Sequence, residues 1–371
     1  MTQANRFAEL GYYTAPGHVH NAKDVGEEVR VGDALGLGSV WISERLNTKE
    51  AGVLCGLAAA NTSHMGIATG LISNLTIRNP VAVAAMASTM ALLTDNRFAL
   101  GMGRGVGPLA DATGTPRLNF KIMEDYIGIL RRLWRGETVN YDGPVGRLTG
   151  LKLGAAIAPP PVICAAMGDK TCEWAGRVCD GVLFNSLWTP EATAHSVKVV
   201  RQAAEKAGRD PASVKIWAVQ VTASDVSEEE MLRTIIRRMN TYLLFGEMMD
   251  FLCRMNGWNP ADVKRLQTEL SKFDRNAMVE GGLLGDEATT RSLDDLRKMR
   301  DFYPRDWIYR GNAVGSADAV AKATLERFEA GVDGVLFHGT QPQHLESLLK
   351  IWPAHRPPGR FDGRSVNPGL S

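Results

Sequence analysis

A string of alternating glycines is the first feature of this sequence that could do chemistry. Residues 100–107 read LGMGRGVG and follow a short apolar run. A dinucleotide-binding fingerprint requires G-x-G-x-x-G between the first strand and the first helix of a βαβ unit. Counted from Gly101, the third glycine position holds Val106; counted from Gly103, it holds Pro108, and the residues that follow read as a loop. The string therefore argues against a Rossmann site. It predicts either a loop whose backbone approaches a flat ligand or a tight turn without a ligand.

A histidine is the second residue of the sequence that could take part in a reaction. His338 directly follows the apolar run from Gly334 to Phe337, which predicts the last strand of the chain. Residues at the carboxyl end of a barrel strand are often functional. Because histidine titrates near neutral pH, His338 is a candidate proton donor. A structural histidine with satisfied hydrogen bonds is the alternative interpretation.

The segments that must position these residues alternate between short apolar runs and amphipathic stretches. Strands are predicted at residues 7–13, 39–42, 65–71, 97–102, 162–166, 181–184, 214–221 and 334–337, with a further short extended run at 306–309. Helices are predicted at residues 24–35, 51–60, from 80 onward, 120–134, 171–178, 190–207, 227–255, 317–330 and 343–351.

Roughly eight strand–helix pairs predict a (β/α)8 TIM-like barrel, with a doubly wound sheet as the competing fold. Barrels of this type have about 250 residues, so the excess in this 371-residue chain predicts insertions around residues 135–155, read as a hairpin, and 224–312. We expect residues 1–352 to form a single domain. Residues 353–371, which are rich in Pro, Gly and Arg, predict an irregular C-terminal tail.

The composition narrows the classes of partner. The formal net charge is +1, so no nucleic-acid partner is expected. No signal peptide and no membrane span is predicted. The five cysteines include no CxxC pair, which predicts reduced thiols in a cytoplasmic protein. His18 and His20 lack a carboxylate partner at a fitting spacing, so no metal site is predicted.

Several segments together resemble one family. They are NRFALGMGRG (residues 96–105), LRRLWRGETVNYDG (130–143), ICAAMGDKTCEWAGRVCDGVLFNS (163–186) and GVDGVLFHG (331–339). Their order and spacing resemble the luciferase-like monooxygenase superfamily, and within it the branch of coenzyme F420-dependent oxidoreductases. The resemblance runs from Leu10 to about Leu349. It implies a luciferase-like TIM barrel that forms a homodimer and binds F420 or FMN at the carboxyl ends of the strands.

The resemblance assigns residues around the cofactor ring. Where F420-dependent dehydrogenases of the branch have Asp-His, this chain has Glu44 and Arg45. Glu44 is expected to contact the ring and to take part in catalysis. Arg45 cannot replace a histidine base, because guanidinium keeps its proton in proteins; it is expected to bind the cofactor instead. The family's non-prolyl cis peptide would join Gly70 and Leu71, with Ser73 near the ring edge.

A second group of residues is assigned to the rest of the cofactor. Arg104 and Gly105 lie in the glycine string, and Arg104 is a candidate for the phosphate or acidic tail. The family's acidic and amide side chains near this point are replaced by Val106 and Leu109. Backbone amides after the fifth strand are expected to cradle the cofactor, from Ala165, Ala166, Met167 and Gly168.

The arginines favour F420 over FMN as the cofactor. Arg45, Arg78 and Arg104 fall near predicted strand ends, where they would face the acidic tail of F420; solvated surface arginines are the alternative interpretation. We expect hydride transfer between carbon 5 of F420 and an unidentified small organic substrate. The alternatives are an FMN-dependent two-component monooxygenase and, because of the replacements at Arg45 and Val106, a cofactor-binding protein without catalysis.

Overall fold

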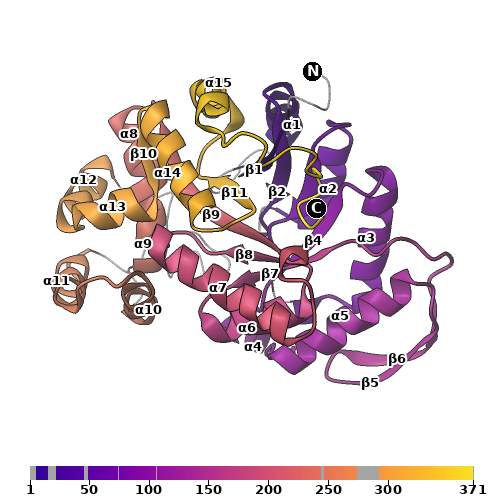
Figure 1. Ribbon diagram of the computed structural model, residues 1–371. Helices are drawn as coiled ribbons and strands as arrows, with labels where there is room; N and C mark the ends of the chain where they lie inside the picture. Colours follow the sequence, from indigo (N-terminus) through magenta and orange to yellow (C-terminus); the bar gives the residue numbers. More distant parts are fainter. Residues whose placement is uncertain are drawn as a thin grey trace.

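The computed structural model describes residues 6–15, 22–45, 49–73, 75–105, 107–243, 246–273 and 292–370. Within these ranges eight parallel strands close into a barrel (Figure 1). In order around the ring they are β1 (Phe7–Tyr13), β2 (Leu37–Ile42), β3 (Gly66–Thr69), β4 (Phe98–Met102), β7 (Val162–Ala166), β8 (Gly181–Phe184), β9 (Lys215–Ser224) and β11 (Gly334–His338). Pairing of β11 with β1 and of β8 with β9 closes the ring. This is the expected (β/α)8 TIM-like fold, and the doubly wound sheet is excluded.

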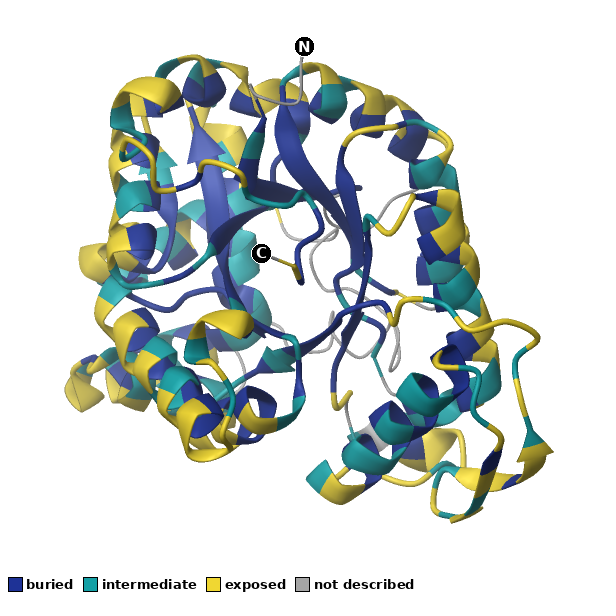
Figure 2. Cartoon of the chain, turned by 45° about the vertical axis from the view of Figure 1, so that its right-hand side comes forward, coloured by how far each residue is buried: buried dark blue, intermediate teal, exposed yellow. Residues whose placement is uncertain are grey.

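Helices surround the strands and turn their exposed faces outward (Figure 2). They are α1 (Asp24–Ala34), α2 (Ala51–Ala59), α3 (Pro80–Leu93), α5 (Phe120–Trp134), α6 (Asp169–Val178), α7 (Pro190–Lys206), α14 (Ala317–Glu329) and α15 (Glu346–His355). Local signals begin several of them: Asn79 caps α3 ahead of Pro80, and Asn119 caps α5, as expected for these residue types. Short 3-10 turns lie at Leu75–Ile77, Pro211–Ser213 and Pro342–Leu345.

Both predicted insertions are present. The first is the antiparallel hairpin of β5 (Val139–Gly143) and β6 (Gly146–Leu151). The second follows β9 and is helical: α8 (Glu228–Met231), a π-helix (Leu232–Ile236), α9 (Arg237–Leu243), α10 (Gly246–Asn256), α11 (Pro260–Leu270), α12 (Leu293–Phe302) and α13 (Arg305–Gly311), followed by the short strand β10 (Ala313–Gly315).

Two local expectations were wrong. The run at residues 306–309 is not extended but lies in α13, where Trp307 is buried and stacks on Trp258 with ring centroids 4.0 Å apart. Burial of two indoles against each other outweighs the strand preference of the local sequence. The glycine string is also followed at once by a short helix, α4 (Gly107–Ala112), and not by a loop.

The barrel interior is filled with side chains, not hollow. Trp41 and Trp217 meet at 5.2 Å between ring centroids. Further apolar residues of the strands pack around them: Tyr13, Ala68, Ala99, Ile163, Leu183, Val219 and Leu336. A second apolar core lies between the strands and the helices. The floor under the carboxyl ends of the strands is therefore rigid and apolar.

The C-terminal tail covers the amino-terminal end of the barrel. Residues after His355 form neither helix nor strand up to residue 370, yet Asn367 and Pro368 are buried. The Asn367 side-chain amide donates to the carbonyl of Phe98 at 3.0 Å, and the Trp217 indole N–H donates to the carbonyl of Pro368 at 2.8 Å. The tail thus packs against the amino-terminal parts of β4 and β9.

Candidate functional site

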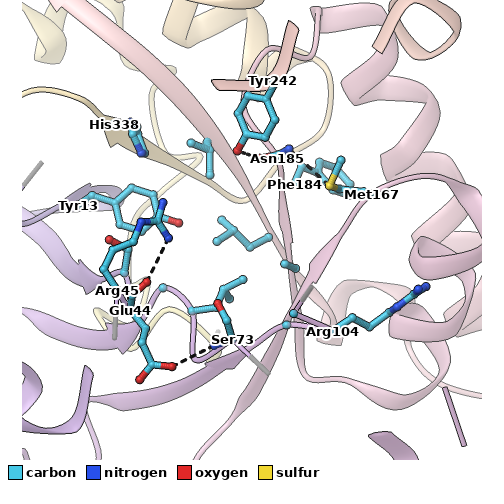
Figure 3. Close-up of a pocket in the computed structure, with 18 of the residues that line it drawn as sticks. Tyr13, Glu44, Arg45, Ser73, Arg104, Met167, Phe184, Asn185, Tyr242 and His338 are labelled. Carbon is cyan, nitrogen blue, oxygen red and sulfur yellow. Dashed lines mark hydrogen bonds between the residues drawn. The ribbon is translucent and has the colours of Figure 1, made fainter. Parts of the chain in front are cut away.

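A cavity of about 520 Å³ opens at the carboxyl ends of the strands. Almost all of the predicted site residues line it, and Figure 3 shows most of their side chains around one space. They are Glu44, Arg45, Gly70, Leu71, Ser73, Arg104, Gly105, Ala165, Met167 and His338. The structure therefore brings these residues together, because the ends of parallel strands meet at one face of a barrel.

Two predicted residues do not line the cavity. Ala166 is fully buried on the helix-facing side of β7, since side chains alternate along a strand and Ala165 takes the cavity side. Gly168 serves as the N-cap of α6 with φ of +75°, a conformation that suits glycine. From the first turn of α6, Thr171 lines the cavity instead.

The cavity wall between β3 and β4 is a bulge tied to the neighbouring backbone. The Gly70–Leu71 peptide bond is cis, as the resemblance implied. The Ile72 amide donates to the carbonyl of Gly101 at 3.0 Å, and the Gly103 amide donates to that of Ile72 at 2.9 Å. A Cβ on Gly101 would lie 1.9 Å from the carbonyl oxygen of Thr69. The glycine string therefore serves first to let β4 approach the bulge.

Glu44 is held in an ion-pair cluster. Its side chain is almost fully buried and pairs with Arg78, which also contacts Glu50 at 2.7 Å between nitrogen and oxygen. The second Glu44 oxygen accepts a hydrogen bond from the Ser73 amide at 3.3 Å. Burial raises the pKa of Glu44, and the Arg78 charge opposes that shift. Glu44 therefore holds the bulge in place through Ser73.

This cluster corrects one expectation about the rim. Arg78 does not line the cavity, because its guanidinium is turned toward Glu44 and Glu50 and forms ion pairs with both. Arg45 and Arg104 do line it, on opposite sides (Figure 3). The Arg45 guanidinium donates to the carbonyl of Glu44 at 3.1 Å, and that of Arg104 lies 5.7 Å from the centroid of the Phe120 ring.

A series of hydrogen-bonded polar side chains, which the sequence did not predict, lines the cavity wall opposite the bulge. Arg238 of α9 donates to the Tyr242 hydroxyl at 2.6 Å, which donates to the Asn185 side-chain oxygen at 3.0 Å. The Asn185 amide contacts the sulfur of Met167 at 3.5 Å. Asn185 directly follows a correctly predicted strand, so the strand-end rule would have found it. Arg238 and Tyr242 lie within the long insertion, where no local pattern marks them.

His338 faces the cavity from the end of β11. Its ring meets the Tyr13 ring edge to face at 5.1 Å between centroids. Its Nδ1 atom is buried and has no hydrogen-bond partner in the described part of the chain. Burial, followed by the charges of Arg238 and Arg45, holds the pKa of His338 well below 6.5. The fold therefore favours the neutral form of the imidazole, and the role of His338 in proton transfer stays a prediction.

The described residues limit other kinds of site. They contain no group of three His, Cys, Asp or Glu side chains arranged to hold a metal ion. His18, His20 and Val106 lie outside the described residues. Among the helices that are described, none combines the length and the apolar character needed to cross a membrane.

A closed parallel barrel with a polar cavity at the carboxyl ends of its strands defines a class of proteins whose active sites lie at that end. Comparison with known families then identifies the group. The family model for luciferase-like monooxygenases matches residues 2–334, so the chain belongs to this family.

The chain is similar to named relatives and to a solved structure. A 5,10-methylenetetrahydromethanopterin reductase of Methanolobus tindarius is 26% identical over 71% of this chain and 79% of its own length. An F420-dependent glucose-6-phosphate dehydrogenase of Amycolatopsis mediterranei is 28% identical over 88% of this chain and 91% of its own. The solved coenzyme F420-dependent tetrahydromethanopterin reductase of Methanopyrus kandleri shares the fold, with a TM-score of 0.74, 18% identity and coverage of 94% and 99%.

Proposed function

We propose that this protein is an F420-dependent oxidoreductase that transfers a hydride between carbon 5 of the deazaflavin and a small organic substrate. The observation that carries the proposal is the gathering of Glu44, Arg45, Leu71, Arg104 and His338 around one cavity. The family resemblance assigns the first four of these positions to the cofactor site, and His338 is added by its place at the end of a barrel strand. The F420-dependent dehydrogenase of Amycolatopsis mediterranei reported above supports F420 over FMN.

The residues present fit this cofactor. Gly70 leaves the wall open, since a Cβ there would lie 2.7 Å from the Tyr13 ring, and Leu71 offers an apolar surface to a planar ring. Arg104 is exposed at the rim and faces no carboxylate in the described ranges. It supplies a cation for the phosphate or acidic tail. The turn at Met167 and Gly168, just before α6, places backbone amides beside that path.

When bound, F420 supplies a carbon centre that accepts or donates a hydride. The chain's own share is positioning and proton handling. Glu44, through Ser73, fixes the bulge that forms one wall. Neutral His338 can accept a proton at its imidazole when an alcohol is oxidised. The apolar floor around Trp41 and Trp217 keeps water out from below.

A pair of titrations tests the proposal. We expect the purified protein to bind F420, followed by quenching of tryptophan fluorescence, and not to bind FMN. Arg104→Glu should weaken F420 binding by about tenfold or more, because it replaces a charge-assisted contact with repulsion. Arg233→Glu, on an exposed side chain of the insertion, is the control and should leave binding unchanged.

Each other outcome has a definite meaning. Binding of FMN alone would contradict the proposal and indicate the monooxygenase alternative. Binding of neither cofactor would remove the cofactor argument. Tight F420 binding without turnover over a broad substrate panel would indicate the non-catalytic alternative.

The protein is further proposed to work as a homodimer in the cytoplasm. Neither α2 nor α3 contains a charged residue, although both lie on the outside of the barrel. Val53, Leu92 and Leu93 on these helices are 70%, 70% and 61% exposed. Such a surface favours contact with a second copy. All five cysteines are free and buried, which fits a reducing compartment.

A further inference from the structure

The cavity contains more positive than negative charge. Arg45, Arg104 and Arg238 line it, whereas Glu44 is its one acidic lining residue among those described. Glu44 already pairs with Arg78 outside the cavity. Glu44 therefore does not neutralise the arginines that line the cavity.

The partners of Arg45 and Arg238 are neutral. Arg238 bonds to the Tyr242 hydroxyl at 2.6 Å and to the Ser186 hydroxyl at 3.4 Å, and its guanidinium stands 4.7 Å from the Tyr242 ring centroid. Arg45 bonds to the Glu44 carbonyl at 3.1 Å. In the described part of the chain neither arginine has a carboxylate partner. Both are oriented by neutral groups that leave donor capacity for a ligand.

The two arginines act on the same pair of groups. Their charges reach both His338 and Tyr13, whose rings are in contact. Lys49 and Arg237 add further positive charge near His338. Cations gathered in a partly dehydrated cavity repel one another, and an anionic ligand removes that repulsion. The Tyr13 hydroxyl lies in this same wall and can donate to an oxyanion.

We infer that the substrate carries an oxyanion, a carboxylate or a phosphate, that binds between Arg45 and Arg238 beside Tyr13. The reacting carbon of the substrate would then lie near His338. This inference rests on the proposed function and adds a substrate class to it: anionic alcohols or their carbonyl counterparts. The acidic tail of F420 offers the same chemistry, but Arg104 on the opposite side of the cavity is available for the tail (Figure 3).

The experiment titrates small anions into the protein with and without F420. Inorganic phosphate and acetate are the probes, methyl acetate is the uncharged control, and ionic strength is held constant. Calorimetry measures anion binding, and tryptophan quenching measures F420 binding to the same samples. The variants are Arg238→Gln and Arg45→Gln, with Arg233→Gln as a matched arginine exposed on the same insertion.

We expect saturable binding of phosphate or acetate to the F420-loaded protein and none of methyl acetate. Arg238→Gln should weaken anion binding at least tenfold and change F420 binding less than twofold. Arg45→Gln should also weaken anion binding at least tenfold. Arg233→Gln should change neither. Arg45→Gln keeps the test informative if Arg238→Gln does not fold, because Arg45 is exposed.

The failures of the two proposals are distinguishable. If F420 binds but no anion follows, the inference is wrong and the proposed function stands. If Arg238→Gln weakens F420 binding tenfold, these arginines hold the cofactor tail and the inference is wrong. If F420 does not bind at all, the proposed function fails. In that case the anion site would still be supported if the cofactor-free protein binds the anion and both variants lose this binding. If the cofactor-free protein binds no anion, the anion site is overturned as well.

Discussion

His338 is a half-buried base near several cations. Its Nδ1 atom lacks a partner in the described ranges, and Arg238 and Arg45 contribute to lowering its pKa well below 6.5. In the unfolded chain the same histidine titrates near about 6.5. Folding thus favours the form without the extra proton, and this single residue couples the stability of the protein to pH.

The sign of that coupling gives a prediction. Below about pH 6.5 the unfolded chain binds a proton that folded His338 does not. The free energy of unfolding therefore decreases as the pH is lowered, by up to about 1.4 kcal/mol per pH unit. The fall continues until the folded-state pKa is reached. Urea unfolding at pH 7.5, 6.5 and 5.5 should show a shallower acid loss for His338→Asn than for the parent chain. Equal slopes for both proteins would show that His338 is not held neutral by the fold.

At the level of residues, sequence reasoning found positions better than it found roles. Glu44, Ser73 and His338 follow strand ends, so their location could be predicted from the barrel topology. The pairing of Glu44 with Arg78 could not, because it joins the end of β2 to the turn before α3. Arg238 was missed since its place in the cavity depends on how a long helical insertion folds back over the barrel.

At the level of elements, the contact between the bulge and β4 depends on one glycine. Thr69 bonds through its side chain to both the carbonyl and the amide of Gly101, at 2.7 and 2.8 Å. No other residue type leaves room for this approach, since a Cβ would lie 1.9 Å from the Thr69 carbonyl. Backbone at both sides of that contact cannot move without opening the barrel sheet.

We therefore expect Gly101→Ala to lower the free energy of unfolding by about 3 kcal/mol or more, as overpacking against backbone does, and to weaken F420 binding. Gly128→Ala is the matched control. Gly128 lies inside α5, and a Cβ there meets nothing within 4 Å, so alanine should stabilise the helix by about 0.5–1 kcal/mol. Urea unfolding of both variants measures the contrast. A Gly101→Ala protein as stable as the parent would contradict the close approach.

Elements whose sequence pattern agrees with their packing were predicted well. Helix α5 was expected at its observed bounds, because its apolar residues fall on one face and Asn119 caps it. The α13 segment was expected to be extended because Trp, Ile and Tyr favour strands. Its helix depends on Trp258, almost fifty residues earlier in the chain, and local propensity cannot report such a contact.

At the level of the whole molecule, the two ends of the barrel have different purposes. The amino-terminal end is covered by the tail, which was expected to be irregular but whose packing against Phe98 and Trp217 was not foreseen. The carboxyl-terminal end holds the cavity. Long-range hydrogen bonds from a Pro- and Gly-rich segment leave no periodic signal, so only the structure could show that the tail belongs to the core.

The outer surface of α2 and α3 leads to the last prediction. These neighbouring helices lack charges and expose Val53, Leu92 and Leu93 (Figure 1). Since exposed leucine side chains are stabilised by burial against a second copy, sedimentation velocity should give twice the chain mass of 40.3 kDa. The double variant Leu92→Glu, Leu93→Glu should sediment as a monomer, because a dimer would bury the new carboxylates in its interface without partners. Tyr309→Glu, at a large exposed residue of α13, should remain dimeric.

A parent protein that sediments as a monomer at micromolar concentration would refute the dimer, and a dimer that survives the double variant would place the interface elsewhere.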